Sequence, residues 1–331
     1  MRTAHGVWST RDGLILRMTD AEGNEGWGEV APIPAFGTET IEAAAEACLA
    51  LGDSVHPRLL AAVPRTLPCL RQALMSAQAE VETNASLRAG TGTRAVVDGR
   101  ALPVAALLPA GKAALEKVGP LIESGFRAFK WKVGMGDVAD ELGVLDDLLA
   151  RLPSGARLRT DANGAWDRRR AERWLERCAD RPIEFVEQPV SPEAKGAEDL
   201  LLGLAADYPT PIALDEAVST LEHITHWLSV GWPGVFVIKP LLLSDPPAAL
   251  AALRARRAPV VFSSALETAV GARSALRLAL ADAPAEGGRA LGFGVWPLFQ
   301  DGRADGPWLA PFVRPDDVER LDPKTVWNAL T

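Results

Sequence analysis

Residues 128–133 read Ala-Phe-Lys-Trp-Lys-Val, residues 158–163 read Leu-Arg-Thr-Asp-Ala-Asn, and residues 185–189 read Phe-Val-Glu-Gln-Pro. Two further runs of the same kind follow, Ala-Leu-Asp-Glu at 213–216 and Val-Ile-Lys-Pro at 237–240. Each run is short and largely apolar, yet carries charged side chains toward its C-terminal end. Because buried parallel strands normally read as nearly continuous apolar runs, these charges point to a function.

The spacing of these runs indicates the fold. Positions 130, 159, 185, 213, 237 and 261 mark successive strand-like runs, 24 to 29 residues apart. Helical patterns lie between several of them, at 140–152, 168–180, 198–207, 248–258 and 269–281. Strands that alternate with helices at this pitch predict parallel βαβ units. About eight such runs between residues 104 and 295 favour a closed α/β barrel over an open doubly wound sheet.

The first hundred residues show a different pattern of expected strands and helices. Strands are expected at 14–18 and 25–31, and helices at 39–51 and 67–86, with Thr38 or Thr40 as a helix cap. The section is therefore α+β. It ends near the Gly-Thr-Gly-Thr stretch at 90–93, which has the composition of a linker.

Composition excludes several classes of protein. The 331 residues are 48% hydrophobic and 24% charged, with a formal net charge of −8. This acidic balance argues against a nucleic-acid or anionic-membrane partner held by bulk charge. The three cysteines, Cys48, Cys69 and Cys178, form no Cys-x-x-Cys pair, so reduced thiols are expected. No signal-peptide core or membrane-span run is visible, and a cytoplasmic location is expected.

Three carboxylates end three consecutive strand-like runs: Asp161, Glu187 and Asp215. In a barrel the C-terminal ends of the strands meet at one rim, so these side chains can converge. Arg159 and Asn163 share a strand face with Asp161, because residues two apart point the same way. Hard oxygen ligands without nearby His or Cys suit Mg²⁺, and Mn²⁺ is expected to be able to substitute.

Lysines flank this triad on both sides along the chain. Lys132 comes before it, with Lys130 on the same strand face, and Lys239 comes after it. A divalent cation between two lysines suits removal of a proton from carbon next to a carboxylate, so a small carboxylate substrate is expected. The like charge of Lys130 favours the neutral amine that Lys132 needs as a base.

Other readings of these residues are weaker. Structural ion pairing explains one charged strand end, but five matched ends are hard to obtain by chance. The Asp-Ala-Asn-Gly stretch at 161–164 lacks the Gly and Glu positions of an EF-hand loop. Ser263 and Ser264 end a seventh run without a His placed to activate them, so a substrate-binding role is expected.

These motifs together resemble the enolase superfamily, in its muconate-lactonizing branch. The resemblance rests on Lys-x-Lys, Asp-Ala-Asn, Glu-Gln-Pro, Asp-Glu and Ile-Lys-Pro in this order. Within that branch, the segments 26–32, 36–40, 129–134 and 262–267 are most similar to the o-succinylbenzoate synthase family. Such a family's capping domain usually begins with a strand upstream of the segment matching residues 3–6, so either the start of the sequence is assigned late or the cap is shortened.

The resemblance implies a modified TIM barrel, (β/α)7β, at 96–295, with an N-terminal α+β capping domain at 1–95 completed by about 296–331. It implies a lyase that dehydrates 2-succinyl-6-hydroxy-2,4-cyclohexadiene-1-carboxylate in menaquinone or phylloquinone biosynthesis. Lys132 would be the base and Lys239 would stabilise the enediolate, while Asp161, Glu187 and Asp215 would hold Mg²⁺. The implied pocket residues are Lys130, Arg159, Asn163, Ser263 and Ser264.

Two alternatives stay open at this point. An N-acylamino-acid racemase or dipeptide epimerase would use the same two lysines on opposite faces of one carbon. The segment 292–301 lacks the Asp-x-Asp-Gly pattern of dipeptide epimerases, which disfavours that reading without removing the racemase. A non-catalytic scaffold would keep the metal ligands but would need neither lysine. The oligomeric state does not follow from the sequence.

Overall fold

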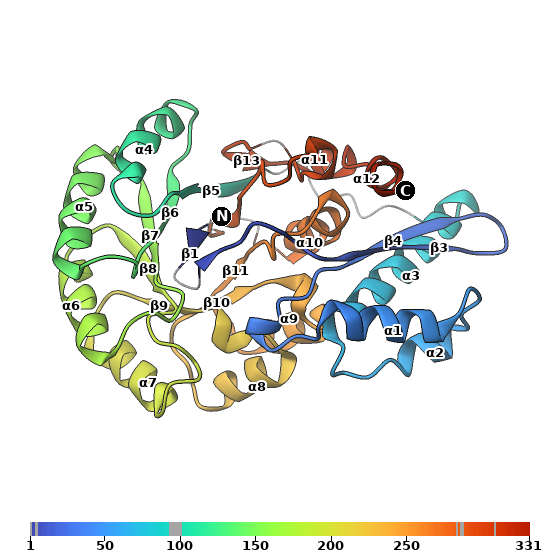
Figure 1. The fold of residues 1–331 in the computed structure, drawn as a ribbon, viewed down its shortest axis with the longest axis horizontal. Helices are drawn as coiled ribbons and strands as arrows, with labels where there is room; N and C mark the ends of the chain where they lie inside the picture. The colour runs from blue at the N-terminus through green and yellow to red at the C-terminus, as the bar shows by residue number, and fades with distance from the viewer. Residues whose placement is uncertain (1, 4–5, 93–100, 283, 285–287, 308) are drawn as a thin grey trace.

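The barrel and the cap lie side by side in the computed structural model of the chain (Figure 1). The structure describes residues 2–3, 6–92, 101–282, 284, 288–307 and 309–331. The expected boundary at residues 95 and 96 lies outside the described residues, as do Thr93 of the expected linker and residues 4 and 5 near the start.

Among the described residues, eight parallel strands form the barrel, in the spatial order β11-β10-β9-β8-β7-β6-β5-β12. They are β5 (Leu102–Leu108), β6 (Ala128–Lys132), β7 (Arg157–Asp161), β8 (Ile183–Glu187), β9 (Ile212–Leu214), β10 (Val235–Ile238), β11 (Val260–Phe262) and β12 (Leu291–Gly294). A single parallel bridge between Ser263 and Gly292 joins the last two strands and closes the ring.

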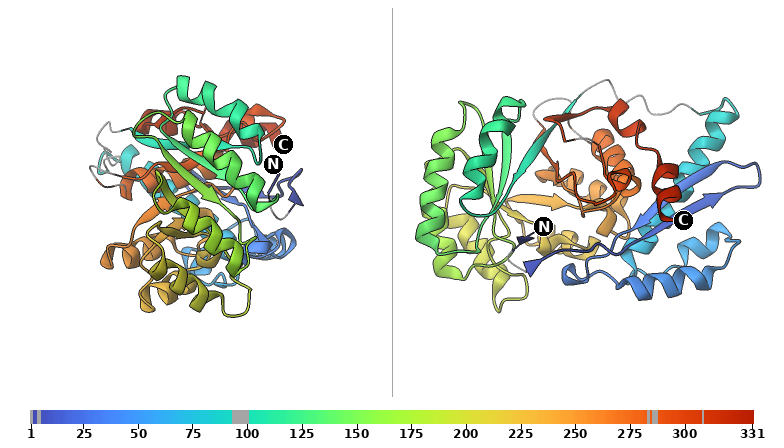
Figure 2. Two further views of the ribbon diagram at one scale, coloured as in Figure 1. Left: turned by 90° about the vertical axis from the view of Figure 1, so that its left-hand side faces the viewer. Right: turned by 45° about the horizontal axis from the view of Figure 1, so that its top comes forward.

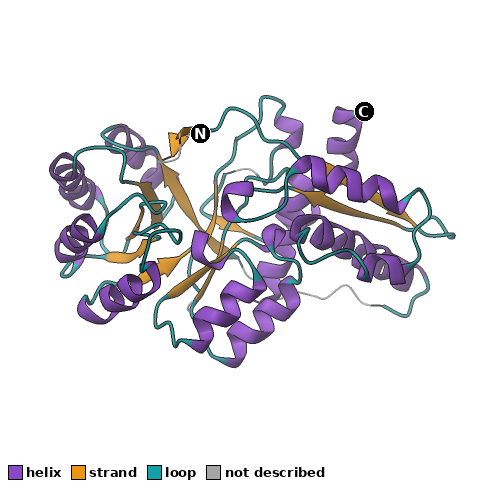
Figure 3. Cartoon of the chain, turned by 60° about the horizontal axis from the view of Figure 1, so that its bottom comes forward, coloured by secondary structure: helices purple, strands orange, loops and turns teal. Residues whose placement is uncertain are grey.

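One helix follows each of the first seven strands, and the described residues show none between β12 and the next short 3-10 turn. These helices are α4 (Ala113–Glu123), α5 (Val138–Arg151), α6 (Arg168–Cys178), α7 (Ala197–Asp207), α8 (Leu221–Ser229), α9 (Pro246–Ala255) and α10 (Ala269–Asp282). They surround the strands (Figure 3). The expected (β/α)7β barrel is thereby confirmed.

Side chains alternate between the inside and the outside of the barrel. Outward residues such as Trp131 pack on the helices, and its ring lies 6.1 Å from that of Trp174 on α6. Inward residues fill the barrel below the strand ends, and one apolar cluster comprises Phe185, Ala213, Val235, Val237 and Val261. This apolar layer lies directly beneath the polar side chains at the C-terminal rim.

The cap is built on a hairpin of two antiparallel strands, β3 (Leu14–Thr19) and β4 (Glu25–Val30). The long helix α3 (Pro68–Arg88) packs on β4, and α1 (Ile41–Leu51) and the short α2 (Pro57–Ala61) complete this part (Figure 2, right). The side chain of Thr40 accepts a hydrogen bond from the backbone of α1, as one of the two expected caps.

Two glycines let β4 approach α3 at backbone distance. A Cβ at Gly26 would overlap the carbonyl oxygen of Ala77, and one at Gly28 would overlap that of Ala73. Because these neighbours are backbone atoms of a helix, they cannot move aside as a side chain would. The Gly-x-Gly spacing in β4 is therefore a packing requirement of the cap.

The C-terminal segment returns to the cap through α11 (Pro315–Glu319) and α12 (Pro323–Leu330). The ring of Trp327 lies 5.6 Å from that of Trp27 on β4, and Lys324 pairs with Glu25 at 2.6 Å. Three short strands were not anticipated: β1 (Arg2–Thr3) with β2 (Gly6–Val7), and β13 (Phe312–Val313), antiparallel to β5. No helix among the described residues is long and apolar enough to cross a membrane.

Substitution of Gly28 by alanine tests the close approach of β4 and α3. Overpacking usually costs about 1–3 kcal/mol, and we expect at least the upper end of this range because both partners are backbone. The control is Gly203→Ala in α7, where a Cβ would meet nothing within 4 Å; that change should stabilise by about 0.5–1 kcal/mol. Denaturant unfolding measures both, and equal midpoints for the two variants would contradict the packing argument.

Candidate active site

A cavity opens at the C-terminal ends of the barrel strands, where the cap covers them. Its polar wall contains Lys130, Lys132, Asn163, Asp215, Glu216, Lys239, Ser263 and Ser264, and its apolar wall contains Trp8, Ile33, Phe36, Ala105, Leu107, Ala265, Leu266 and Val295. The cap therefore contributes three apolar side chains, none of which was predicted from the sequence to line the pocket. No local pattern marks them, because their role depends on how the cap is seated.

The three expected metal-binding carboxylates occupy neighbouring strand ends. Asp161 ends β7, Glu187 ends β8, and Asp215 directly follows β9. Asp161 and Glu187 are partners in the parallel register of β7 and β8. All three are buried, the most exposed being Asp215 at 4%.

The lysines contact these carboxylates directly. Nζ of Lys130 lies 2.8 Å from Oδ2 of Asp161 and 2.6 Å from Oε1 of Glu187, so a single ammonium group bridges two of the three acids. Nζ of Lys132 donates to Asp161 at 2.7 Å. Lys239 donates to Asp215 from the other end of the row.

The charges change one another's ionisation. Burial acts to raise the pKa of Asp161, but the ammonium groups of Lys130 and Lys132 outweigh it and hold this pKa below its usual range. Burial raises the pKa of Glu187 to about 7, and the charge of Asp161 adds to the shift. Burial also raises the pKa of Asp215. For Glu187 and Asp215, the neighbouring ammonium groups therefore offset only part of the cost of burying a carboxylate.

The donor set suits a hard divalent cation. Glu216 joins the triad as a fourth buried carboxylate, and its Oε2 is buried without a hydrogen-bond partner. Four buried acids thus face three lysines, which leaves room for another positive charge. As the side chains stand, no three His, Cys, Asp or Glu residues in the described part of the chain form a ready-made cage. The ammonium of Lys130 takes a cation's place between Asp161 and Glu187.

Asn163 and Gln188 hold the rim in shape. Both have positive φ angles, 45° and 35°, which few non-glycine residues adopt. The amide of Asn163 accepts from Lys132 at 2.8 Å and donates to Glu216 at 3.0 Å, so it links Lys132 to the acid cluster. Oε1 of Gln188 accepts from the backbone N–H of Asp215 at 2.9 Å. The Glu-Gln-Pro motif was visible in the sequence, but the contact of Gln188 was not.

The two expected serines lie on the loop after β11 and line the cavity. Ser264 donates to the buried Glu267 at 3.0 Å and accepts from the backbone of Leu266 at 2.9 Å. The hydroxyl of Ser263 donates to the carbonyl of Gly292 at 3.3 Å, beside the bridge that closes the barrel.

Arg159 is not brought into the cavity, contrary to the expectation that it lines the pocket. Its side chain points inward with Asp161 but turns away from the rim, where Nε donates to Glu184 at 2.7 Å. The guanidinium also lies 4.8 Å from the ring centre of Phe185 in the apolar layer below. A face assignment cannot tell which way along the strand a long side chain extends, and here Glu184 decides it.

Phe36 places the cap over Lys239. It ends the short 3-10 turn Pro34–Phe36, and Nζ of Lys239 lies 4.9 Å from its ring centre. A cation over an aromatic face is attracted to it more strongly when water is excluded. Phe36 therefore both shields and stabilises the charge of Lys239.

Comparison with known proteins agrees with this geometry. Residues 4–81 match the family model of the MenC N-terminal domain, and residues 113–243 match that of the enolase C-terminal domain-like family. An o-succinylbenzoate synthase of Thermosynechococcus vestitus is 40% identical over 300 residues, covering 89% of this chain and 88% of that protein. A hydrophobic dipeptide epimerase of Roseobacter litoralis is 35% identical over 237 residues, covering 66% of this chain and 64% of that protein.

A solved structure is similar along nearly the whole chain. It is o-succinylbenzoate synthase from Thermosynechococcus elongatus BP-1, complexed with Mg in the active site. The TM-score is 0.76 at 37% identity, and the match covers 99% of this chain and 95% of that one. The chain belongs to the o-succinylbenzoate synthase family, within the enolase superfamily.

Proposed function

We propose that this chain is an o-succinylbenzoate synthase, a lyase that removes water from 2-succinyl-6-hydroxy-2,4-cyclohexadiene-1-carboxylate to form 2-succinylbenzoate in menaquinone or phylloquinone biosynthesis. The observation that carries the proposal is the placement of Lys132 and Lys239 at opposite ends of a row of buried carboxylates in a covered cavity. The 40% identity to an o-succinylbenzoate synthase over most of both chains supports the choice of reaction.

Asp161, Glu187 and Asp215 would hold the metal ion, Mg²⁺ with Mn²⁺ as a substitute. When bound, the cation supplies stabilisation of the negative charge that develops on the substrate carboxylate as the neighbouring carbon loses its proton. The excess of buried acids over lysines and the unpartnered Oε2 of Glu216 support a further cation here.

Lys132 is the proposed base. Its Nζ lies between Asp161 and Asn163, which orient the amine toward the cavity. The neutral amine takes the proton from the carbon next to the carboxylate. The same proton then leaves on the departing hydroxyl group as water, which restores the neutral amine and leaves the aromatic ring. A single lysine can serve both steps because syn elimination places proton and hydroxyl on one face.

Lys239 is the proposed electrostatic partner. Asp215 and Phe36 hold its ammonium at the other end of the row. There it can stabilise negative charge without taking part in proton transfer. The apolar side chains of the cap exclude water, which strengthens each of these charge interactions.

A racemase or epimerase is the second candidate, and one observation favours it. The epimerase of Roseobacter litoralis is 35% identical to this chain, and two lysines on opposite sides suit proton exchange at one carbon. Incubation with an N-acyl amino acid in D₂O tests it by mass spectrometry. Fast deuterium exchange at the α-carbon, with no turnover of the cyclohexadiene carboxylate, would replace the lyase assignment.

Removal of the Lys132 amine should abolish the dehydration. A general base contributes about 10²–10⁴-fold to the rate, so Lys132→Ala should lower kcat by at least about a hundredfold while circular dichroism stays unchanged. Lys117→Ala, at an exposed position of α4, is the matched control and should keep full activity. Turnover by Lys132→Ala within tenfold of the unaltered enzyme would remove Lys132 as the base.

Metal affinity should depend on each acid of the triad. Changes outside the ligand shell already cost about 10–100-fold in affinity, so Asp161→Asn, Glu187→Gln and Asp215→Asn should each cost at least that much for Mg²⁺ by calorimetry. Glu193→Gln, at an exposed site after β8, is the control. EDTA should stop turnover and added Mg²⁺ or Mn²⁺ should restore it. Unchanged Mg²⁺ affinity in all three variants would refute the site.

A further inference from the structure

The loop at 263–266, which we call the serine loop, lines the cavity and is held both by hydrogen bonds within the barrel and by a contact from the cap. It joins β11 to α10, and all four of its residues line the cavity wall. Leu266 has a φ of 61°, in the left-handed region that few non-glycine residues adopt. Neighbouring contacts must therefore keep its conformation.

Glu29 provides the first contact from the cap, which it makes to the start of α10, just beyond the serine loop. It lies on β4 and is 4% exposed. Its carboxylate accepts hydrogen bonds from the backbone N–H of Thr268 at 2.9 and 3.1 Å, from the Thr268 hydroxyl at 2.5 Å and from the N–H of Gly271 at 2.8 Å. The first N–H groups of a helix have no partner within the helix. Glu29 thus caps α10 from 242 residues away in the chain.

The fit at this contact is tight. A Cβ on Gly271 would lie 2.8 Å from Oε2 of Glu29 and would overlap the side chain of Leu241. The glycine therefore admits the carboxylate to the helix terminus. A cap acid and a barrel glycine are matched here in shape as well as in hydrogen bonding.

Arg11 provides the second contact from the cap. Its guanidinium donates to the carbonyls of Ala31 at 2.5 Å and Pro32 at 2.7 Å, both in the cap, and to the carbonyl of Ala265 at 3.2 Å. One side chain therefore ties the end of the cap hairpin to the middle of the serine loop. Glu267, just beyond that loop, is fully buried and accepts from Ser264 and from the N–H of Ala265.

We propose that Glu29 and Arg11 are positioning residues, through which the seated cap sets the serine loop in its substrate-binding conformation. Neither residue is among those that line the cavity. They act through Thr268, Gly271 and Ala265 on the wall that meets the substrate. The kinetic test of this inference rests on the proposed function, whereas the hydrogen bonds of Glu29 and Arg11 do not depend on it.

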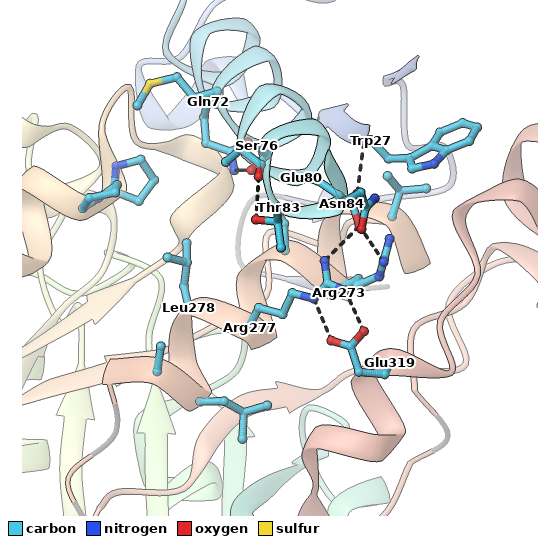
Figure 4. Close-up of a pocket in the computed structure, with 18 of the residues that line it drawn as sticks. Trp27, Gln72, Ser76, Glu80, Thr83, Asn84, Arg273, Arg277, Leu278 and Glu319 are labelled. Atoms are coloured by element: carbon cyan, nitrogen blue, oxygen red, sulfur yellow. Dashed lines mark hydrogen bonds and ion pairs between the residues drawn. The ribbon is translucent and has the colours of Figure 1, made fainter. Parts of the chain in front are cut away.

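A second cap-to-helix contact offers a matched control. Glu80 on α3 pairs with Arg273 at 2.5 Å and with Arg277 at 3.0 Å, both on α10, and Arg277 continues to Glu319 (Figure 4). This network also fastens the cap to α10, but it contacts the helix beyond its first turn and does not contact the serine loop. Glu80→Gln therefore weakens the junction without touching the loop.

The experiment compares Glu29→Ala, Glu29→Gln and Glu80→Gln in the full chain. If only a fraction of the molecules holds the loop in its substrate-binding conformation, the apparent affinity for the substrate falls in proportion to that fraction. We expect Glu29→Ala to raise KM about tenfold or more with kcat within about threefold, because the lysines lie on other strands. Glu29→Gln should recover part of the loss, since an amide oxygen can still accept from Thr268 and Gly271. Glu80→Gln should leave KM unchanged.

Hydrogen exchange of the peptide spanning 260–275 gives a readout that does not need turnover. Glu29→Ala and Arg11→Lys should speed exchange at 265–271, whereas Glu80→Gln should not. Should Glu29→Ala not fold, Glu29→Gln and Arg11→Lys carry the same comparison. Unchanged KM and exchange in the Glu29 and Arg11 variants, or equal changes in Glu80→Gln, would overturn the inference. An unaltered enzyme without dehydratase activity would instead overturn the proposed function, so the two failures are distinct.

Discussion

The mutual neutralisation of charges inside the barrel rim is the constraint on which the rest of the structure depends. Four carboxylates and three lysines are withdrawn from most of the solvent at neighbouring strand ends. A buried charge that loses its partner typically costs about 3–5 kcal/mol, so each group must be placed where another compensates it. The parallel register of β6, β7 and β8 does this, since Lys132, Asp161 and Glu187 are aligned across it. Chemistry and stability thus depend on the same pairs.

The apolar layer below the rim and the cap above it make those charge interactions strong. Phe185 and its neighbours fill the barrel from beneath, and Phe36 covers Lys239 from the cap. Low polarity on both sides increases the attraction between opposite charges and the cost of an unpaired one. The cap is therefore more than a lid, because Arg11 contacts the loop that completes the cavity wall and Glu29 contacts the helix that follows this loop.

Much of this arrangement could be predicted from the sequence. The spacing of the strand-like runs predicts the barrel, and the charged residues at their ends predict which side chains gather at the rim. The expected helices at 140–152 and 269–281 agree with α5 and α10 to within two residues at each end. Helix α4, which carries Pro120 in its interior, was not predicted. Arg159 lies on the predicted strand face but not in the predicted surroundings, because Glu184 draws the side chain away from the rim.

By itself, the sequence determined the features that depend on local order along the chain. The alternation of strand and helix, the inward face of each strand and the side chain at each strand end follow from the period of two and from the direction of parallel strands. Only the tertiary structure decided which lysine neutralises which acid, that Phe36 covers Lys239, and that Glu29 caps a helix 242 residues away. The physical reason is that these contacts join segments with no shared local pattern. Their geometry is set by how the cap docks on the barrel, where many weak packing contacts act together.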